Sequence, residues 1–333
     1  MRFMNKVGAV AAGFALFLLA IFPLQGQKVG PQDQGQPVPS AQSNNLQASS
    51  TNVWVQLTGV ANGAASLVLY VPATATNSIL DLFYTTNCED TSSWGRVMRC
   101  LPGQTNLVVT NLPCAQGFFA VSSPIRPGFD QQILDRNDDG SSALVPLPFI
   151  INFLSNSESA LYVNNNGNVS FEKSLSTYSP VNLMGAGVRI IAPFWADVDT
   201  RSPSPGVVQY GTNVVHGHSA FGVDWVNVGY YAFHSDRLLS CQLVLIDRSD
   251  TAPGNFDVEF NYDRVEWQWG DVSVGSPPRA GFSDGITDYE MGGSGTNGVF
   301  MDTNTVTGLV YNSLKSPMLG RYVFQFRGGQ PLP

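Results

Sequence analysis

The segment from Phe256 to Asp263 alternates strictly between apolar and polar residues, and this period of two constrains the fold more than any other feature of the sequence. An extended strand places alternate side chains on opposite faces, whereas a helix would need a period of 3.6. The apolar residues that share one face are Phe256, Val258, Phe260 and Tyr262. We therefore predict a half-buried antiparallel strand with one face toward a core and the other toward water.

Other short apolar runs, separated by turn residues, repeat this strand signal, and no segment after the first 26 residues has helical periodicity. Six runs within residues 51–123 predict a small β-sandwich. Stronger signals over 141–326 predict a larger antiparallel β-sandwich, joined to the first by a polar connection at 124–139. Asn166-Gly167, between 161–163 and 168–171, predicts a hairpin turn, since such turns require positive φ angles. The fold class expected is all-β.

The N-terminus has the layout of a secretory signal peptide. Arg2 and Lys6 precede an apolar stretch over 7–22, and small or neutral residues follow up to Gly26. The apolar stretch is shorter than the roughly 20 residues of a membrane-spanning helix, so we expect cleavage near Gly26 rather than an anchor. Residues 27–50 are rich in Gln, Pro, Ser and Asn and are predicted to be a disordered linker. The mature chain is thus expected to be secreted, without a transmembrane segment.

The charge balance limits the partners. The chain has 17 Lys and Arg against 25 Asp and Glu, a net charge of −8. Nucleic acids and anionic membranes attract basic patches, so neither is an expected partner. Export permits disulfides, and one pair is predicted among Cys88, Cys100 and Cys114. Cys241 lies in an apolar run and is predicted to be a buried free thiol.

An ordered series of motifs resembles the nidogen-type extracellular (NIDO) domain, a family that includes many exported bacterial proteins. The motifs are Asn137–Ser142, Leu161–Phe171, Ile190–Thr200, Phe221–Tyr231, Gln242–Asp247, Asn255–Tyr262 and Arg279–Phe282. The resemblance covers residues 130–327. It implies an extracellular, non-enzymatic domain linked to cell–matrix adhesion, with no known catalytic residues.

Asp135, Asn137 and Asp139, followed by Gly140, match the first half of an EF-hand-like calcium loop. The twelfth position is Pro146 rather than a bidentate Glu, so the alternative is an acidic turn whose side chains bond nearby backbone. Calcium is the one cofactor that the sequence suggests.

Two further polar groups have chemical and structural interpretations. Asp197 and Asp199 alternate on an extended segment and could form a glycosidase pair or hold an ion, but catalytic carboxylates normally approach a sugar from opposite sides. We therefore expect a metal-binding or structural role. His216 and His218 could bind zinc, but too few further ligands lie nearby, and a hairpin tip is the favoured interpretation.

Aromatic residues in or beside the strands offer a ligand surface if they project outward. The candidate rings are Trp225, Tyr230, Tyr231, Phe233, Trp267 and Trp269. The ligand surface is expected at Trp225, Tyr230 and Tyr231, against the alternative that most of these rings are core. The leading functional hypothesis is a secreted, non-enzymatic protein that binds an extracellular matrix or cell-surface protein or glycan. The alternatives are a carbohydrate-binding module, with or without calcium, and, more remotely, a secreted glycoside-active enzyme.

Overall fold

A computed structural model describes residues 54–61, 64–71, 79–85, 95–101, 104, 106–113, 118–202 and 206–333. The predicted signal peptide, the predicted linker at 27–50, Cys88 and Cys114 lie outside the described residues. The chain divides into two compact units, with the boundary after Ser122. Among the described residues the helical segments are two short 3-10 helices, η3 (Leu183–Ala186) and η4 (Leu309–Tyr311), so the all-β prediction is confirmed.

The smaller unit contains six antiparallel strands in two three-stranded sheets, as predicted. One sheet has the order β1 (Trp54–Ala61), β2 (Ala64–Tyr70), β5 (Asn106–Pro113), and the other has the order β4 (Gly95–Cys100), β3 (Leu80–Thr85), β6 (Phe118–Ser122). Both sheets contribute to a single apolar core, which includes Leu67 and Leu69 from β2, Leu82 from β3 and Val121 from β6. The unit is therefore a β-sandwich.

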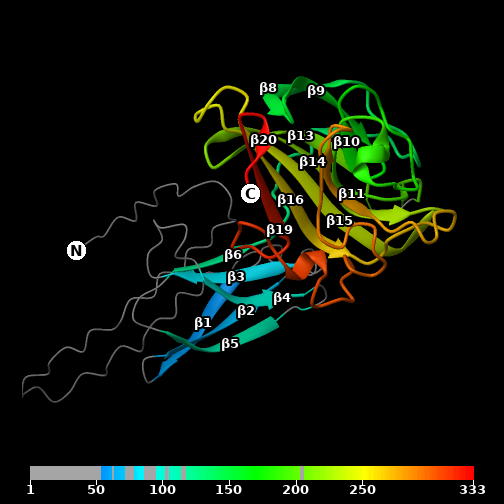
Figure 1. Cartoon of the computed structure of the whole chain (residues 1–333). Helices are drawn as coiled ribbons and strands as arrows, with labels where there is room; N and C mark the ends of the chain where they lie inside the picture. The colour runs from blue at the N-terminus through cyan, green and yellow to red at the C-terminus, as the bar shows by residue number, and fades with distance from the viewer. Residues whose placement is uncertain are drawn as a thin grey trace, which may run out of the picture. The chain divides into compact units, whose positions relative to one another are not determined.

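The larger unit contains two antiparallel sheets (Figure 1). The six-stranded sheet has the order β18 (Asp288–Glu290), β17 (Arg279–Ser283), β11 (Ile190–Trp195), β10 (Asn168–Ser170), β9 (Asn156–Asn164), β8 (Val145–Phe153). The eight-stranded sheet has the order β20 (Gln330–Pro331), β19 (Arg321–Arg327), β16 (Phe256–Val265), β15 (His234–Asp247), β14 (His218–Tyr230), β13 (Val208–Val215), β7 (Gln132–Ile133), with β12 (Val198–Asp199) paired to β14.

The two sheets face each other across an aromatic core. Phe153 of β8 contacts Phe326 of β19, with ring centroids 5.7 Å apart. The buried hydroxyl of Tyr262 in β16 donates a hydrogen bond to the carbonyl of Pro193 in β11 at 2.7 Å. Because a buried phenol needs a polar partner, this bond fixes one sheet against the other.

The predicted hairpin forms between β9 and β10, and Gly167 explains its shape. Asn164 pairs with Asn168, which leaves a three-residue loop. Within it Gly167 has a φ of +71°, while Asn166 has an ordinary negative φ, so the turn uses one positive φ rather than the two expected. A Cβ at Gly167 would lie 1.8 Å from the carbonyl oxygen of Phe194, so no side chain fits at this position.

Strand β16 corrects one prediction. Its apolar residues face the core as expected, but the opposite face is buried as well, so the strand is not half-exposed. Asp257, Glu259 and Asn261 are all less than 9% exposed. Over Glu259 the cover comes from a segment that we call the strap, residues 123–131.

The strap overlaps the segment 124–139, which was expected to be a connection, and it packs as part of the larger unit instead. Arg126 makes two hydrogen bonds to Glu259, Nε to Oε2 at 2.6 Å and Nη2 to Oε1 at 2.9 Å. Phe129 is fully buried in a cluster that includes Val215 and Ile246. A Cβ on Gly222 would lie 2.4 Å from the Phe129 ring, so the absent side chain at Gly222 makes room for this ring.

Two cysteines can be assessed. Cys241 in β15 is fully buried and free, which confirms the prediction. Cys100 at the end of β4 is also a buried free thiol, so a disulfide through Cys100 is wrong. Cys100 packs as part of the apolar core of the smaller unit, where it acts as a small hydrophobe. A pair between Cys88 and Cys114 stays a prediction.

Candidate functional site

Three carboxylates meet at one end of the larger unit. Asp138 and Asp139 lie in the loop after β7, and Asp197 lies between β11 and β12. One oxygen from each lies within 4.8 Å of the other two. We call these residues the acidic cluster. Carboxylate oxygens at this spacing are the ligands that Ca²⁺ and Mg²⁺ take in proteins.

The β9–β10 turn holds the cluster in place. Asn166 Nδ2 donates to Asp139 Oδ1 at 2.8 Å, while its Oδ1 accepts the backbone N–H of Val198 at 3.0 Å. Asn165 Nδ2 bonds the carbonyls of Asp138 and Val198. The Asn-rich turn thus ties the loop after β7 to β12 through buried amide side chains.

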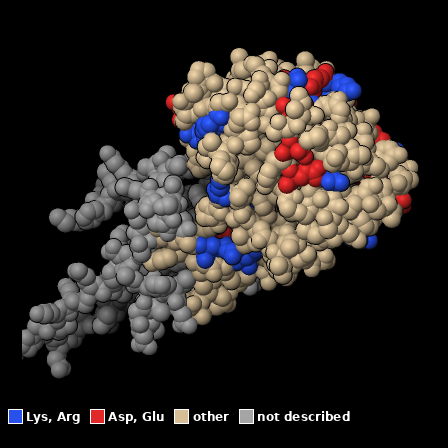
Figure 2. Space-filling view, viewed as in Figure 1, with Lys and Arg blue, Asp and Glu red and all other residues tan. Residues whose placement is uncertain are grey.

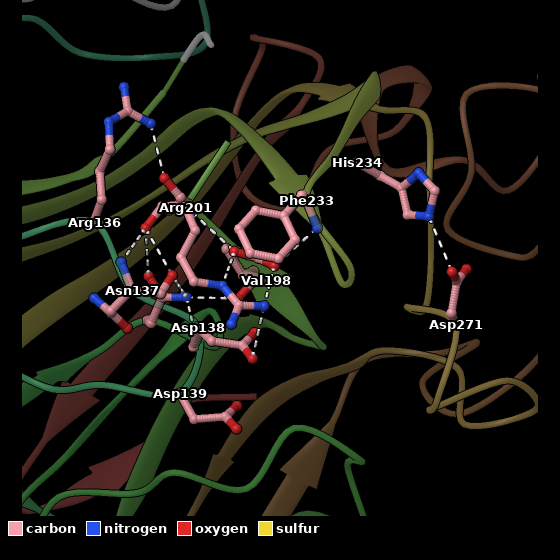
Figure 3. Close-up of polar contacts among 12 residues, drawn as sticks. Arg136, Asn137, Asp138, Asp139, Val198, Arg201, Phe233, His234 and Asp271 are labelled. Atoms are coloured by element: carbon pink, nitrogen blue, oxygen red, sulfur yellow. Dashed lines mark hydrogen bonds and ion pairs between the residues drawn. The ribbon is translucent and has the colours of Figure 1, made fainter. Parts of the chain in front are cut away.

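The acidic cluster differs from the predicted calcium loop. Asn137 Oδ1 accepts the N–H of Gly140 at 2.6 Å, and its Nδ2 donates to the carbonyl of Asp135 at 2.6 Å. The amide therefore closes a local turn, which is the structural alternative considered for this sequence. Asp135 is exposed and outside the cluster, so Asp139 is the one predicted ligand that belongs to it (Figure 3).

One guanidinium contacts the acidic residues around the cluster. Arg201 Nε and Nη2 bond both oxygens of Asp199, at 2.9 and 2.7 Å, and Nη2 lies 3.1 Å from Asp138 Oδ2. Asp138 Oδ1 is buried and has no hydrogen-bond partner among the described residues. Arg136 points its Nη1 at the carbonyls of Thr200 and Ser202 instead of at a carboxylate. Four carboxylates and one partnering arginine leave excess negative charge.

Burial and this excess of negative charge raise the pKa of two carboxylates of the cluster. Burial raises the pKa of Asp138 to about 6, and the charges of Asp139 and Asp199 act in the same direction. Burial also raises the pKa of Asp197 to about 6, against the lowering effect of a 2.7 Å hydrogen bond from Ser273 Oγ. A bound cation would lower the pKa of both carboxylates again, because an opposite charge stabilises the ionised form.

Asp199 is in the opposite situation. Burial raises its pKa, but hydrogen bonds from Arg201 and from the N–H of Phe233 outweigh this effect and lower it. Both of its oxygens are occupied, and Asp197 and Asp199 are at most 1% exposed. A glycosidase needs two carboxylates that reach the substrate from opposite sides. This geometry argues against the catalytic interpretation of the pair.

The predicted aromatic surface is corrected by burial. Trp225 is fully buried and donates Nε1 to the carbonyl of Asn165 at 3.0 Å. Tyr230 is 8% exposed and stacks on His234 at 4.6 Å. Tyr231 is half-buried. Both faces of β14 are covered in this region. The cover comes from segments distant in the sequence, which local alternation does not reveal.

Another of the candidate rings, outside the three expected to form the surface, is exposed. Phe233 is 58% exposed, and its ring covers the guanidinium of Arg201 at 4.3 Å from the ring centroid. Figure 3 shows the ring over Arg201, close to the acidic cluster, while His234 and Asp271 lie apart. The sequence placed Phe233 among the candidates but did not distinguish it from the buried rings.

The two histidines lie at a hairpin tip, as expected. His216 and Gly217 join β13 to β14 with φ angles of +52° and +84°. His216 Nε2 lies 3.3 Å from Arg126 Nη2, while His218 Nδ1 lies 3.8 Å from Asp250. The rings therefore have different partners, and neither histidine belongs to a possible metal-binding group among the described residues.

Comparisons with known proteins assign the larger unit. A family model described as NIDO related matches residues 123–315. Alpha-tectorin from Mus musculus is 29% identical over 183 residues, and that from Homo sapiens is 28% identical over the same length; each match covers 46% of this chain and 8% of the relative. Alpha-tectorin from Gallus gallus is 28% identical over 179 residues, or 44% of this chain and 8% of the relative. No solved structure matches.

The chain thus spans less than a tenth of the length of these relatives. Within the described residues, no helix has the length and apolar character needed to cross a membrane. The family model covers more than half of the chain and begins where the larger unit begins, at Ser123. The chain therefore belongs to the NIDO-related family.

Proposed function

We propose that this chain is a secreted, non-enzymatic interaction protein that binds an extracellular matrix or cell-surface component through its larger unit. The observation that carries the proposal is the NIDO-related match over residues 123–315, with alpha-tectorin among the relatives. The NIDO resemblance implies an extracellular domain linked to cell–matrix adhesion. The predicted signal peptide supplies the route out of the cell.

The surface chemistry supports binding rather than catalysis. Asp197 and Asp199 are closed off from a substrate, as described above. Charged side chains are sparse on the face seen in Figure 2, which leaves a surface of mostly neutral groups. Phe233 is an exposed ring held on a rigid hairpin, where its N–H bonds Asp199 Oδ2 at 3.0 Å. Exposed, fixed aromatic rings are frequent anchors in protein interfaces.

A solid-phase adhesion assay tests this proposal. The full secreted chain is added to immobilised matrix proteins and to cell layers, and bound protein is measured against an albumin control. Saturable binding at micromolar concentration or below, weakened at least tenfold by Phe233→Ala, is expected. The matched control is Ile150→Ala, a residue of β8 that is 59% exposed against 58% for Phe233. Absence of saturable binding to every matrix and cell preparation would contradict the proposal.

A second candidate function is binding of a divalent cation by the acidic cluster, which would make the interaction calcium-assisted. The specific observation is the convergence of three carboxylates around a buried Asp138 Oδ1 that has no hydrogen-bond partner in the described part of the chain. A cation bound there would link the loop after β7 to the segment before β12 through ion contacts. That link would stiffen the loops beside Phe233, where the interface is proposed.

Calorimetric titration with CaCl₂ and MgCl₂ tests the cation site. We expect exothermic or endothermic saturable binding that is lost in an Asp139→Asn, Asp197→Asn double variant. Asp135→Asn serves as the control, because Asp135 belongs to the predicted loop but is exposed and outside the cluster. Equal heats for the wild-type chain and the double variant at millimolar ion would exclude this site.

A further inference from the structure

A shallow cavity of about 270 Å³ lies in the larger unit between the edge strand β18 and the helix η4. Its lining includes Tyr289, Met291, Gly292, Thr307, Asn312 and Tyr322. The volume is slightly below the roughly 300–1,000 Å³ of pockets for drug-sized ligands, so the cavity suits a single ring rather than an extended molecule. We call this cavity the tyrosine pocket.

The two tyrosine rings are held rigidly. Tyr289 stacks on Phe282 with centroids 5.2 Å apart and also contacts Phe324 edge-on at 5.3 Å. Tyr322 donates its hydroxyl to the carbonyl of Leu309 at 3.1 Å and packs edge-on against Tyr262 at 5.6 Å. Because the surrounding core fixes both rings, little rotamer entropy would be lost on binding a ligand.

The polar groups of the tyrosine pocket are mostly acceptors. Thr307 Oγ1 donates to the carbonyl of Val299 at 2.8 Å, and Asn312 Nδ2 donates to the carbonyls of Val306 and Gly308 at 3.0 and 3.1 Å. Their donor capacity is thus used within the protein, while Asn312 Oδ1 and the Thr307 oxygen still have lone pairs. The Tyr289 hydroxyl makes no hydrogen bond within the described part of the chain.

No charged side chain lines the tyrosine pocket among the described residues. A charged ligand would therefore lose its hydration without gaining an opposite charge, which is costly. The ligand that fits these walls is neutral, has one apolar face for a tyrosine ring and carries several hydrogen-bond donors. A pyranose ring has all three properties, because its axial C–H groups form an apolar face and its hydroxyls donate.

We propose that the tyrosine pocket binds one neutral pyranose residue, with the sugar against Tyr289 and its hydroxyls donating to Asn312 and Thr307. This rests on the proposed function and gives its extracellular partner a chemical class, a glycan. Binding at this pocket is independent of the acidic cluster, which shares no residue with it. The bound residue is either a free sugar or the terminal unit of a glycan chain.

The glycine in the lining provides a selective test. Gly292 has an ordinary negative φ, and a Cβ built on it would have no atom within 4 Å. Gly292→Leu should therefore fill the tyrosine pocket without disturbing the fold. Tyr289→Ala removes the stacking face by a second route. Ile286→Ala is the control, because Ile286 is 84% exposed and does not line the pocket.

The experiment is saturation-transfer NMR on the full chain with methyl glycosides of glucose, galactose, mannose and N-acetylglucosamine, and with neutral oligosaccharides that end in the same sugars. We expect transfer to at least one neutral sugar, reduced at least fivefold by Gly292→Leu and by Tyr289→Ala, unchanged by Ile286→Ala and unchanged by EDTA. Stronger transfer to the oligosaccharide would identify a glycan chain end as the ligand, and equal transfer a free sugar.

No transfer from any neutral sugar, or transfer that both pocket variants leave intact, would overturn the pyranose proposal. The adhesion assay described above separates this failure from failure of the proposed function. A wild-type chain that adheres but shows no sugar transfer would leave the matrix interaction standing and remove the sugar pocket. A wild-type chain that shows sugar transfer but does not adhere would do the reverse. Thermal melts of both pocket variants, within a few degrees of wild type, would show that each variant is folded.

Discussion

Two groups of buried charges in the larger unit differ in how they are balanced. Under the strap, Arg126 and Arg321 share the single carboxylate of Glu259, with Arg321 Nε at 3.6 Å from Glu259 Oε2. In the acidic cluster and the adjoining Asp199, four carboxylates lie near one guanidinium, which contacts Asp138 and Asp199. The first group satisfies its carboxylate within the chain, whereas the second leaves carboxylates that another cation could satisfy.

The pKa values follow this difference. Burial raises the pKa of Glu259, but Arg321 and Arg126 outweigh burial and lower it to about 2. Burial lowers the pKa of Arg321 to about 10, with Glu259 acting against this. The pKa values of Asp138 and Asp197 are instead raised to about 6. A group with depressed acid pKa stabilises the fold at neutral pH, whereas raised acid pKa values destabilise it, which suits a site that gains from a ligand.

The largest expected effect comes from removing the carboxylate of Glu259 from its pairing with Arg126 and Arg321, which we call the balanced group. Glu259→Gln leaves two buried guanidinium groups without a carboxylate, so we expect the free energy of unfolding to fall by about 3–5 kcal/mol. Urea denaturation at pH 7 measures this, with exposed Asp288→Asn as the control. A loss below about 1 kcal/mol would show that the strap does not depend on this ion pair.

A smaller effect is expected at Asp224, a carboxyl beside the balanced group. Asp224 has no basic partner among the residues that the structure describes. Burial raises its pKa to about 7, against the 2.7 Å hydrogen bond from Gln242 Nε2. Its folded-state pKa lies above the unfolded value, so stability is lost as pH rises from about 4 to 7. Asp224→Asn keeps the acceptor oxygen, and between pH 4 and 8 it should gain about 2–4 kcal/mol relative to wild type. Parallel stability curves would contradict this assignment.

Asp197→Asn tests the acidic cluster with the adjoining Asp199, which we call the unbalanced group. In EDTA, the wild-type chain should lose stability as pH rises from about 4 to 6, and the variant should be about 1–2 kcal/mol more stable at pH 7. In millimolar calcium the order should reverse, because the variant lacks one ligand for the ion. Thermal melts at fixed pH with and without calcium measure both effects. If calcium moves both melts equally, the acidic cluster holds no ion.

The smallest effect is expected at Phe233. Phe233→Ala removes a ring that lies over Arg201 at the exposed edge of the unbalanced group. An exposed cation–π contact contributes about 0.5–1 kcal/mol, so the stability should change by no more than that. Adhesion should nevertheless fall at least tenfold. If stability and adhesion fall together, the ring supports the fold rather than the interface.

The local sequence was sufficient to predict those parts of the structure that depend on neighbouring residues along the chain. All six strands of the smaller unit, the Gly167 hairpin and the inward face of β16 follow from alternation and turn chemistry. The burial of the outer face of β16 was not predictable in this way. It depends on Arg126, a residue 133 positions before Glu259, which no local period reports.

The same limit explains why the sequence predicted the candidate site only in part. The spacing of Asp135, Asn137 and Asp139 suggests a calcium loop, but Asn137 bonds its own backbone and Asp135 faces solvent. Asp197 joins the cluster from the segment between β11 and β12, 58 positions after Asp139, and chain order does not disclose that approach. The residue types were informative, and their three-dimensional grouping required the fold.

The strap also has a mechanical consequence. The last strand of the smaller unit ends at Ser122, and the carbonyl of Pro124 already accepts a 2.7 Å hydrogen bond from Arg321 in β19. A force applied through the smaller unit would therefore act on the contacts of Arg321 and Arg126 before it acted on the strands of the larger unit. Charge-assisted bonds are among the strongest that side chains make. A chain that joins two structures under strain would carry its load through these arginines.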